Sequence, residues 1–252
     1  MADGHRPGPE NMALDHALAL ERSPDTGILR IYGWERPTVS FGRNEPARGL
    51  YDFGMADREG VAFVRRPTGG RAVLHDHEIT YCVVTAPRAW GGLRAAYRAI
   101  NQGLVAALRT LGVDAGLAGA PTGGEAPLSA GPCFQIPAEG EVVAAGRKLV
   151  GSAQARVGGA LLQHGSLLLS GSQDPLARIG PEAAAEAGAL PVTLRSLLGS
   201  VPRWDELVSA LVDGLSGVLG GSWDRTGFRD AEVQTAKELG KRYRSREWTW
   251  RR

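Results

Sequence analysis

Three consecutive strand-like segments in residues 141–169 restrict the fold of this chain more than any other feature. The sequence EVVAAGRKLVGSAQARVGGALLQHGSLLL contains three apolar stretches that glycines separate. Short apolar stretches bounded by glycine are typical of strands, because glycine adopts the backbone conformations that tight turns require. The segment therefore predicts strands that follow one another without an intervening helix.

The rest of the chain mixes strands with helices. Strand patterns occur at residues 27–34, 38–42, 61–66, 71–75, 78–86 and 113–118, and helix patterns at residues 11–23, 52–60, 92–112, 203–220 and 230–243. The helix at 92–112 is the clearest, because its apolar residues recur at intervals of three and four. Runs of strands with interspersed helices favour an α+β fold over a doubly wound parallel sheet.

Composition indicates how the chain is organised and where it works. The 252 residues are 43% hydrophobic, which is enough to bury a core without disulfide bonds. Two cysteines, Cys82 and Cys133, are too few for a disulfide framework or a zinc site, and free thiols indicate a reducing, cytoplasmic location. No apolar run is long enough to span a bilayer and no signal peptide is present, so we expect no membrane association. We expect a disordered tail at residues 1–10, one folded domain at 11–220 and a helical extension packed on it at 221–252.

The charge pattern argues against a nucleic-acid partner. The net charge is only +2, from 29 basic and 27 acidic residues. Proteins that bind nucleic acid usually gather their basic side chains into a patch, whereas the arginines here are scattered. The densest groups, at residues 63–71 and 241–252, suit an acidic protein partner.

The sequence RRPTGGRAVLHDHEITY at residues 65–81 predicts a tight glycine turn. Gly69 and Gly70 let the backbone approach a ligand closely, and successive N–H groups there can hold a carbonyl or phosphate oxygen. Positive charge around the turn comes from Arg65, Arg66 and Arg71. The same pattern also fits an ordinary hairpin with exposed arginines.

Several other motifs indicate structural roles. His75 and His77 have no third metal ligand nearby in the sequence, so we expect them to form hydrogen bonds and expect no metal site. Ser166 stands inside an apolar strand, where a packed or hydrogen-bonded hydroxyl is the favoured interpretation. The sequence has no P-loop, no dinucleotide fingerprint and no HExxH motif.

Cys133 and Lys148 are candidates for a reactive pair. A thiol with its ordinary pKa near 8.5 is mostly protonated at neutral pH, and a neighbouring ammonium favours the thiolate. Cys133 follows a loop rich in glycine and proline, and Lys148 stands in a strand-rich segment. A thiolate that attacks a thioester exchanges one thioester for another, so it needs no ATP. The competing interpretation is a buried cysteine that acts as a small hydrophobe, as we expect for Cys82, and a solvated lysine.

Four motifs in fixed order resemble the biotin/lipoate protein ligase superfamily and its lipoate-protein ligase A-like branch. They are NMALDHALAL, RRPTGGRAVLHDHEITY, GRKLVGSAQAR and LQHGSLLL, and they cover residues 11 to about 170. The resemblance implies a catalytic domain built on a mixed, largely antiparallel sheet flanked by helices. Residues 11–220 would form this domain.

The resemblance also implies an activity. The turn sequence TGGRAVLHD and the cysteine of PCF are similar to those of the octanoyltransferases of this branch. Cys133 would carry the acyl thioester, and Lys148 would lower the pKa of the thiol and orient the acyl carbonyl. The substrate pocket would be shaped by Arg66, Gly69, Gly70, Arg71, His75, Gly151 and Ser152, with the last two as an oxyanion hole.

The implied reaction moves octanoate from octanoyl-acyl carrier protein to a lysine of a lipoyl-domain protein such as glycine cleavage H protein. It requires no cofactor. Two alternatives remain open from the sequence. One is an ATP-dependent lipoate or octanoate ligase, and the other is a catalytically inactive acyl-binding module.

Overall fold

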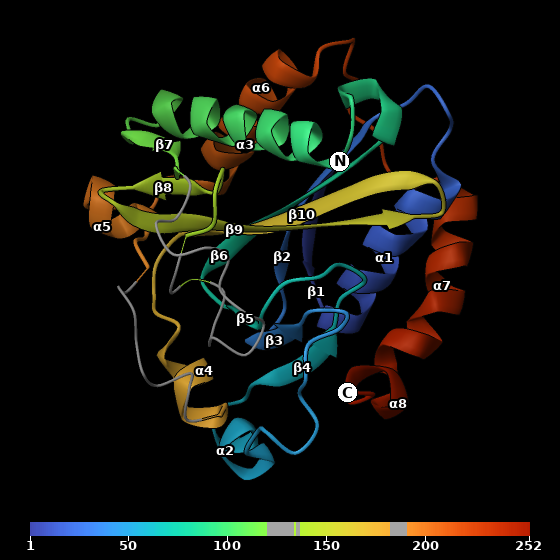
Figure 1. The fold of residues 1–252 in the computed structure, drawn as a ribbon, viewed down its shortest axis with the longest axis vertical. Coiled ribbons are helices and arrows are strands. Elements are labelled where there is room, and N and C mark those ends of the chain that lie inside the picture. Colours follow the sequence, from blue (N-terminus) through green and yellow to red (C-terminus); the bar gives the residue numbers. More distant parts are fainter. Residues whose placement is uncertain (120–133, 135–136, 182–190) are drawn as a thin grey trace.

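The computed structural model describes residues 1–119, 134, 137–181 and 191–252 (Figure 1). The larger of two sheets has seven strands in the described residues, in the order β1-β2-β6-β10-β9-β8-β7. These strands are β1 (Ala2–Arg6), β2 (Ile28–Trp34), β6 (Glu78–Thr85), β10 (Ala160–Leu168), β9 (Arg147–Val157), β8 (Val142–Ala144) and β7 (Ala115–Leu117). Only the β1–β2 pair of this sheet is parallel. The prediction of a mixed, largely antiparallel sheet is confirmed.

A second sheet lies below the first in Figure 1 and carries the glycine turn. Its order is β4 (Ala62–Arg65), β3 (Thr38–Phe41) and β5 (Val73–His75), with β3 parallel to β4 and antiparallel to β5. The turn at 66–72 therefore connects the two outer strands of this sheet. Two short helices, α2 (Phe53–Arg58) and α4 (Asp174–Ile179), pack against each other beside it.

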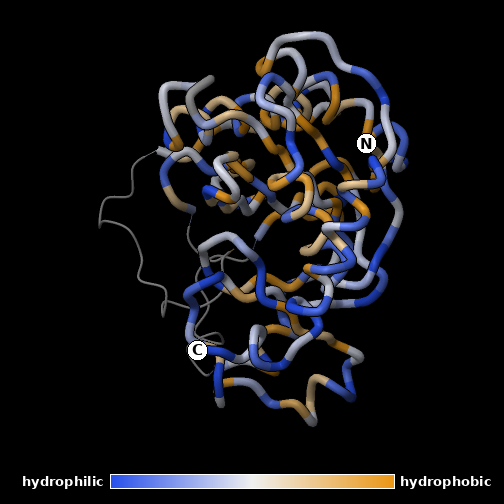
Figure 2. Tube along the Cα trace, turned by 90° about the vertical axis from the view of Figure 1, so that its right-hand side faces the viewer, coloured by the Kyte–Doolittle hydropathy of each residue, from blue (hydrophilic) through white to orange (hydrophobic). Residues whose placement is uncertain are grey.

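Helices cover both faces of the large sheet (Figure 1). On one face α3 (Leu93–Thr110) packs against α6 (Trp204–Leu219), over a core that includes Ile31, Tyr81 and Val83. On the other face α1 (Gly8–Glu21) packs against α7 (Asp230–Arg244), over Tyr32 and Cys82. Successive residues of one strand thus serve opposite cores, as alternation in a strand requires. Figure 2 shows the hydrophobic stretches gathered inside the molecule.

The remaining short helices lie at the edges of these layers. They are a 3₁₀ helix (Pro87–Trp90), α5 (Leu194–Leu198) and α8 (Arg246–Thr249), and the last of these contacts both α7 and β4. Within the described residues, no helix is both long enough and apolar enough to cross a membrane.

The N-terminal ten residues differ from the sequence-based expectation of a disordered tail. Ala2–Arg6 forms β1, which pairs with β2, and α1 begins at Gly8. The strand is held by backbone pairing and by ion pairs of Asp3 with Arg6 (2.8 Å) and with Arg30 (2.9 Å). An edge strand stabilised in this way needs no apolar side chains, and a polar sequence such as Ala2–Arg6 therefore looks like that of a disordered tail.

The predicted strands at 141–169 are present, although two of them are long. β9 has 11 residues and β10 has nine. The breaks fall at Ala145-Gly146 and Gly158-Gly159, all of which have positive φ. Gly151 and Gly165 instead lie inside paired strands.

Candidate active site

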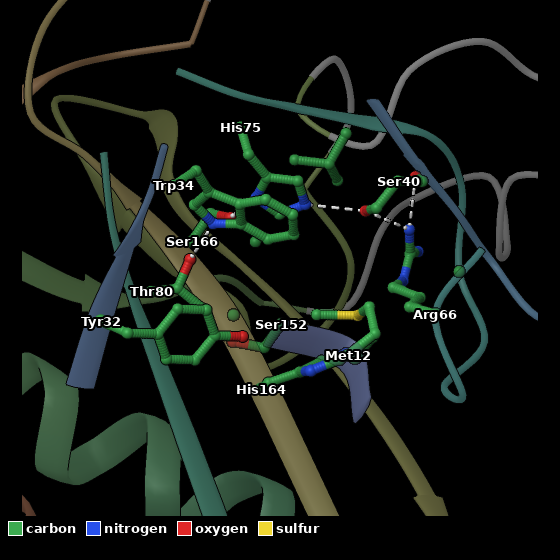
Figure 3. A pocket seen from close by; sticks show the side chains of 15 residues that line it. Met12, Tyr32, Trp34, Ser40, Arg66, His75, Thr80, Ser152, His164 and Ser166 are labelled. Carbon is green, nitrogen blue, oxygen red and sulfur yellow. Dashed lines mark hydrogen bonds between the residues drawn. The ribbon is translucent and has the colours of Figure 1, made fainter. Parts of the chain in front are cut away.

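A cavity lies where the glycine turn meets the large sheet, and the space between its lining atoms, part of it open to solvent, is about 410 Å³ (Figure 3). Its wall is formed by strands β2, β3, β5, β6, β9 and β10, helix α1 and the turn at 66–72. The lining residues are Met12, Tyr32, Trp34, Ser40, Arg66, Gly70, Val73, His75, Thr80, Gly151, Ser152, Ala153, His164, Gly165 and Ser166. Polar side chains of the wall are hydrogen-bonded to one another or to residues behind the wall, which leaves apolar surface for a ligand.

Arg66 fixes the glycine turn from inside. Its Nη2 donates to the carbonyl oxygens of Gly69 (2.7 Å) and Arg71 (2.8 Å), and its Nη1 donates to that of Ser40 (2.7 Å). Gly70 has a φ of 89°, which favours glycine. A Cβ at Gly42 would lie 1.8 Å from the Gly70 carbonyl oxygen, so the two backbones touch. The turn is therefore held in one position beside the cavity.

His75 is packed and hydrogen-bonded, as the sequence predicted. Its ring stacks on Trp34 with centroids 3.9 Å apart (Figure 3). Nε2 lies 2.7 Å from Ser40 Oγ, and Nδ1 lies 3.1 Å from a carboxylate oxygen of Glu78. His77 lies on an exposed turn with a φ of 48°. Among the described residues, no three His, Cys, Asp or Glu side chains group to hold a metal ion.

A buried polar network behind the cavity joins α1 to β2 and β10. Asp15 accepts hydrogen bonds from Arg30 (2.7 Å) and Tyr32 (2.8 Å), and its other contact is His164 Nδ1 at 2.9 Å. Burial alone would raise the pKa of Asp15, but the hydrogen bond to His164 and the charge of Arg30 hold it below its usual value. Burial lowers the pKa of His164.

The same network reaches the glycine turn. His164 Nε2 lies 2.7 Å from Thr68 Oγ1, and Thr68 is completely buried. Asp15 and His164 thus position the turn through Thr68.

Lys148 lies behind the cavity wall with Glu141 as its partner. Its Nζ is 2.7 Å from Glu141 Oε1, and the residue is only 2% exposed. The same Nζ lies 5.4 Å from the ring centroid of Phe134, a buried side chain. A Cβ at Gly151 would lie 3.0 Å from that ring and 3.5 Å from Lys148 Cε. The lack of a side chain at 151 therefore leaves room for Phe134 next to the lysine.

The structure brings most of the predicted site residues together. Arg66, Gly70, His75, Gly151 and Ser152 line the cavity, whereas Gly69 and Arg71 contribute carbonyl oxygens to Arg66. Lys148 is adjacent to the wall at Gly151. Cys133 lies outside the described residues.

The other two predictions for single residues are confirmed. Cys82 is completely buried, and burial raises the pKa of its thiol. Ser166 is buried with its Oγ 3.1 Å from His75 Nδ1.

Sequence reasoning missed Asp15, His164, Ser40 and Glu141. A signal existed for two of them: Asp15 interrupts the apolar helix MALDHALAL, and His164 interrupts the apolar strand ALLQHGSLLL. A buried charged or polar side chain needs partners, so such interruptions predict a network. Ser40 and Glu141 have ordinary sequence surroundings and depend on the tertiary fold.

Several known proteins resemble this chain in sequence over most of its length. The sequence matches the family described as lipoyl protein ligase A/B catalytic domain over residues 7–216. A protein named octanoyltransferase LipM from Kyrpidia tusciae is 40% identical over 261 residues, which cover 96% of this chain and 94% of that protein. The octanoyltransferase LipM of Bacillus subtilis is 33% identical over 260 residues, with the same coverage of 96% and 94%.

Solved structures confirm the predicted fold. A lipoate-protein ligase A bound with ATP superposes with a TM-score of 0.82 at 25% identity, covering 99% of this chain and 96% of that chain. A T. acidophilum protein with bound lipoic acid gives a TM-score of 0.81 at 25% identity, with 99% and 98% coverage.

Proposed function

The chain belongs to the lipoyl protein ligase A/B catalytic domain family and acts as an octanoyltransferase, and we propose that Cys133 carries the octanoyl group as a thioester. Octanoyl transfer is the activity named for relatives that are 33–40% identical over nearly the whole chain. Its acceptors are lipoyl-domain proteins. The donor we propose is octanoyl-acyl carrier protein, and glycine cleavage H protein is one proposed acceptor.

The position of Phe134 carries the proposal for Cys133. Phe134 follows Cys133 directly in the chain, and consecutive Cα atoms are about 3.8 Å apart. Its ring lies against Gly151 and 5.4 Å from Lys148 Nζ. A nucleophile at 133 is thus tethered to a residue that touches both the lysine and the cavity wall.

Lys148 has the surroundings that an activating residue requires. It is buried and held by Glu141, so its ammonium group stays in one position instead of moving as a surface lysine would. In a region of low dielectric constant, a fixed ammonium group favours a nearby thiolate over the thiol. Glu141 compensates the charge of Lys148 when no thiolate is present.

The reaction then takes two balanced steps. The Cys133 thiolate attacks the thioester carbonyl of the donor, a new thioester forms, and the carrier leaves as a thiolate that takes up a proton. The ε-amine of the acceptor lysine next attacks the enzyme thioester. An amide forms, the amine loses a proton, and the Cys133 thiol is restored. Gly151 and Ser152 are consecutive residues of β9, so their N–H groups point to opposite sides of the strand, and only one of the two is proposed to stabilise the oxyanion in both steps.

The cavity is proposed to hold the octanoyl chain. Met12, Tyr32, Trp34 and Val73 supply apolar wall, and Gly70 of the glycine turn also lines the cavity. Each buried methylene contributes about 0.8 kcal/mol, so the six methylenes of an octanoyl group contribute roughly 5 kcal/mol against very short acyl groups.

The proposal is tested by intact mass spectrometry after incubation with octanoyl-acyl carrier protein without ATP. We expect one octanoyl adduct, which Cys133→Ser abolishes. Cys82→Ser is the matched control and keeps the adduct, because that buried thiol stays protonated. An enzyme that forms no adduct, yet modifies a lipoyl domain when ATP is added, is a ligase. Carrier binding without either reaction indicates an acyl-binding module.

A further inference from the structure

A group of basic side chains, three of them exposed and one half-buried, adjoins the glycine turn and takes no part in the steps above. We propose that this arginine patch binds the negatively charged acyl carrier that delivers the octanoyl group; the patch consists of Arg43, Arg242, Arg251 and Arg252. The inference rests on the proposed function, in which the octanoyl donor is an acyl carrier protein. Its residues come from the loop at 42–48, from α7 and from the C-terminal end of the chain.

Backbone hydrogen bonds attach the patch to the substrate cavity. Arg43 N–H donates to the Thr68 carbonyl oxygen at 2.7 Å, and Gly42 touches Gly70 of the turn. On its other side the loop binds the C-terminal segment: the N–H groups of Ala47 and Arg48 donate to the Arg252 carbonyl oxygen at 2.9 and 2.6 Å. The loop is thus packed between the cavity's turn and the C-terminal residues.

Aromatic packing holds two further guanidinium groups in the same place. The Arg251 Cζ lies 4.3 Å from the centroid of Trp248, and the Arg242 Cζ lies 5.3 Å from it. Arg251 also donates to the Arg43 carbonyl oxygen. In Figure 1 the C-terminus lies next to α8, which packs against β4 of the small sheet. Residues far apart in sequence therefore form one basic surface.

The patch has an unbalanced positive charge. In the part of the chain that the structure describes, no carboxylate lies within ion-pair distance of any of its four guanidinium groups. The nearby Glu45 is buried and points inward, where it accepts from the N–H groups of Gly42 (2.9 Å) and Ala72 (2.7 Å). Burial and the charges of the other patch arginines lower the pKa of Arg251. Mutual repulsion of this kind is relieved when an anion binds.

An acyl carrier has the chemistry that such a surface recognises. It presents its acyl group on a phosphopantetheine arm, and the phosphodiester of that arm is negatively charged. Guanidinium groups bind phosphate and carboxylate oxygens through paired hydrogen bonds. Arg43, Arg242 and Arg252 are exposed side chains that can supply such donors. A patch beside the cavity would place the arm so that its thioester enters the site.

The test compares two octanoyl donors with the full-length enzyme. Octanoyl-acyl carrier protein carries the protein surface and the phosphodiester, whereas octanoyl-pantetheine is neutral and has neither. The variant is the double charge reversal Arg43→Glu/Arg242→Glu, since neither guanidinium donates a hydrogen bond to a described residue. Arg98→Glu, exposed on α3 over the opposite face of the large sheet, is the matched control.

We expect the double variant to lower kcat/KM for the acyl carrier by roughly ten- to a hundredfold at low salt, with a smaller loss at high salt. Activity with octanoyl-pantetheine should stay within about twofold, as should both activities of Arg98→Glu. An equal loss with both donors overturns the inference. So does a loss confined to transfer from the octanoyl-enzyme to a lipoyl domain, because the patch then binds the acceptor. Should the wild-type enzyme form no thioester, the proposed function fails, and the carrier's affinity for wild type and variant still decides the role of the patch.

Discussion

Removing Glu141 while Lys148 remains is the perturbation that most strongly tests the geometry behind the cavity. The two charges lie 2.7 Å apart, and their side chains are only 6% and 1% exposed. Breaking a buried ion pair by removing one partner costs about 3–5 kcal/mol, because the other charge is left without compensation. For a domain of this size, 1 kcal/mol corresponds to about 2–4 °C in Tm, so Glu141→Gln should lower Tm by roughly 6–20 °C.

The assay is urea unfolding and thermal melting of Glu141→Gln, Lys148→Met and the double variant. The double variant should lose less free energy of unfolding than the two single variants lose together. The difference, which is the coupling energy of the pair, should be about 1–3 kcal/mol. Asp205→Asn provides the control, since its ion pair with Arg203 is largely exposed and its loss should leave the free energy of unfolding close to the wild-type value. If the free energy of unfolding of Glu141→Gln lies within about 1 kcal/mol of the wild-type value, the pair is not the buried, fixed contact described above.

Three further predictions address the network, the pH dependence and the glycine turn. Asp15→Asn should cost about 2–3 kcal/mol of unfolding free energy in urea titrations, because it removes the buried one of the two carboxylates that pair with the Arg30 guanidinium; a loss below about 1 kcal/mol would contradict this. Burial and nearby arginines lower the pKa of His16 from 6.5 to about 4. The contribution of neutral His16 to folding stability is therefore complete above pH 6.5 and is lost as the pH falls toward 4. The urea midpoint should therefore fall between pH 7.5 and 5, and less steeply in His16→Gln; equal slopes would rule out this cause. Gly42→Ala should reduce octanoyl transfer by more than about tenfold, because its Cβ would strike the Gly70 carbonyl, whereas Gly4→Ala, with no atom within 4 Å, should be fully active; similar activities would show that the turn is not held by this contact.

The secondary structure of the chain could largely be predicted from local patterns. The helix at 92–112 and the strands around residues 28–34 and 78–85 carry apolar patterns that their burial explains. β1 could not be predicted, because its stability comes from pairing with β2 and from ion pairs distant in sequence. Pairing of this kind leaves no periodic signal.

The candidate site was only partly predictable for a related reason. The glycine turn carries its own signal in Gly70, since few residues other than glycine adopt its positive φ. The partners of the turn do not. Ser40 approaches it from β3, Gly42 from the residue after that strand, and His164 from β10. The role of Glu141 likewise depends on the strand register that pairs Val143 with Lys148.

The most direct test of the central claim is a chase of the isolated octanoyl-enzyme. The enzyme is acylated with octanoyl-acyl carrier protein, separated from the donor and mixed with a lipoyl domain without ATP. We predict that the octanoyl group disappears from Cys133 and appears on the acceptor lysine in equal amounts, as intact mass and peptide mapping would record. An adduct that stays on the enzyme, or an acceptor modified only after ATP is added, would contradict transfer through a Cys133 thioester.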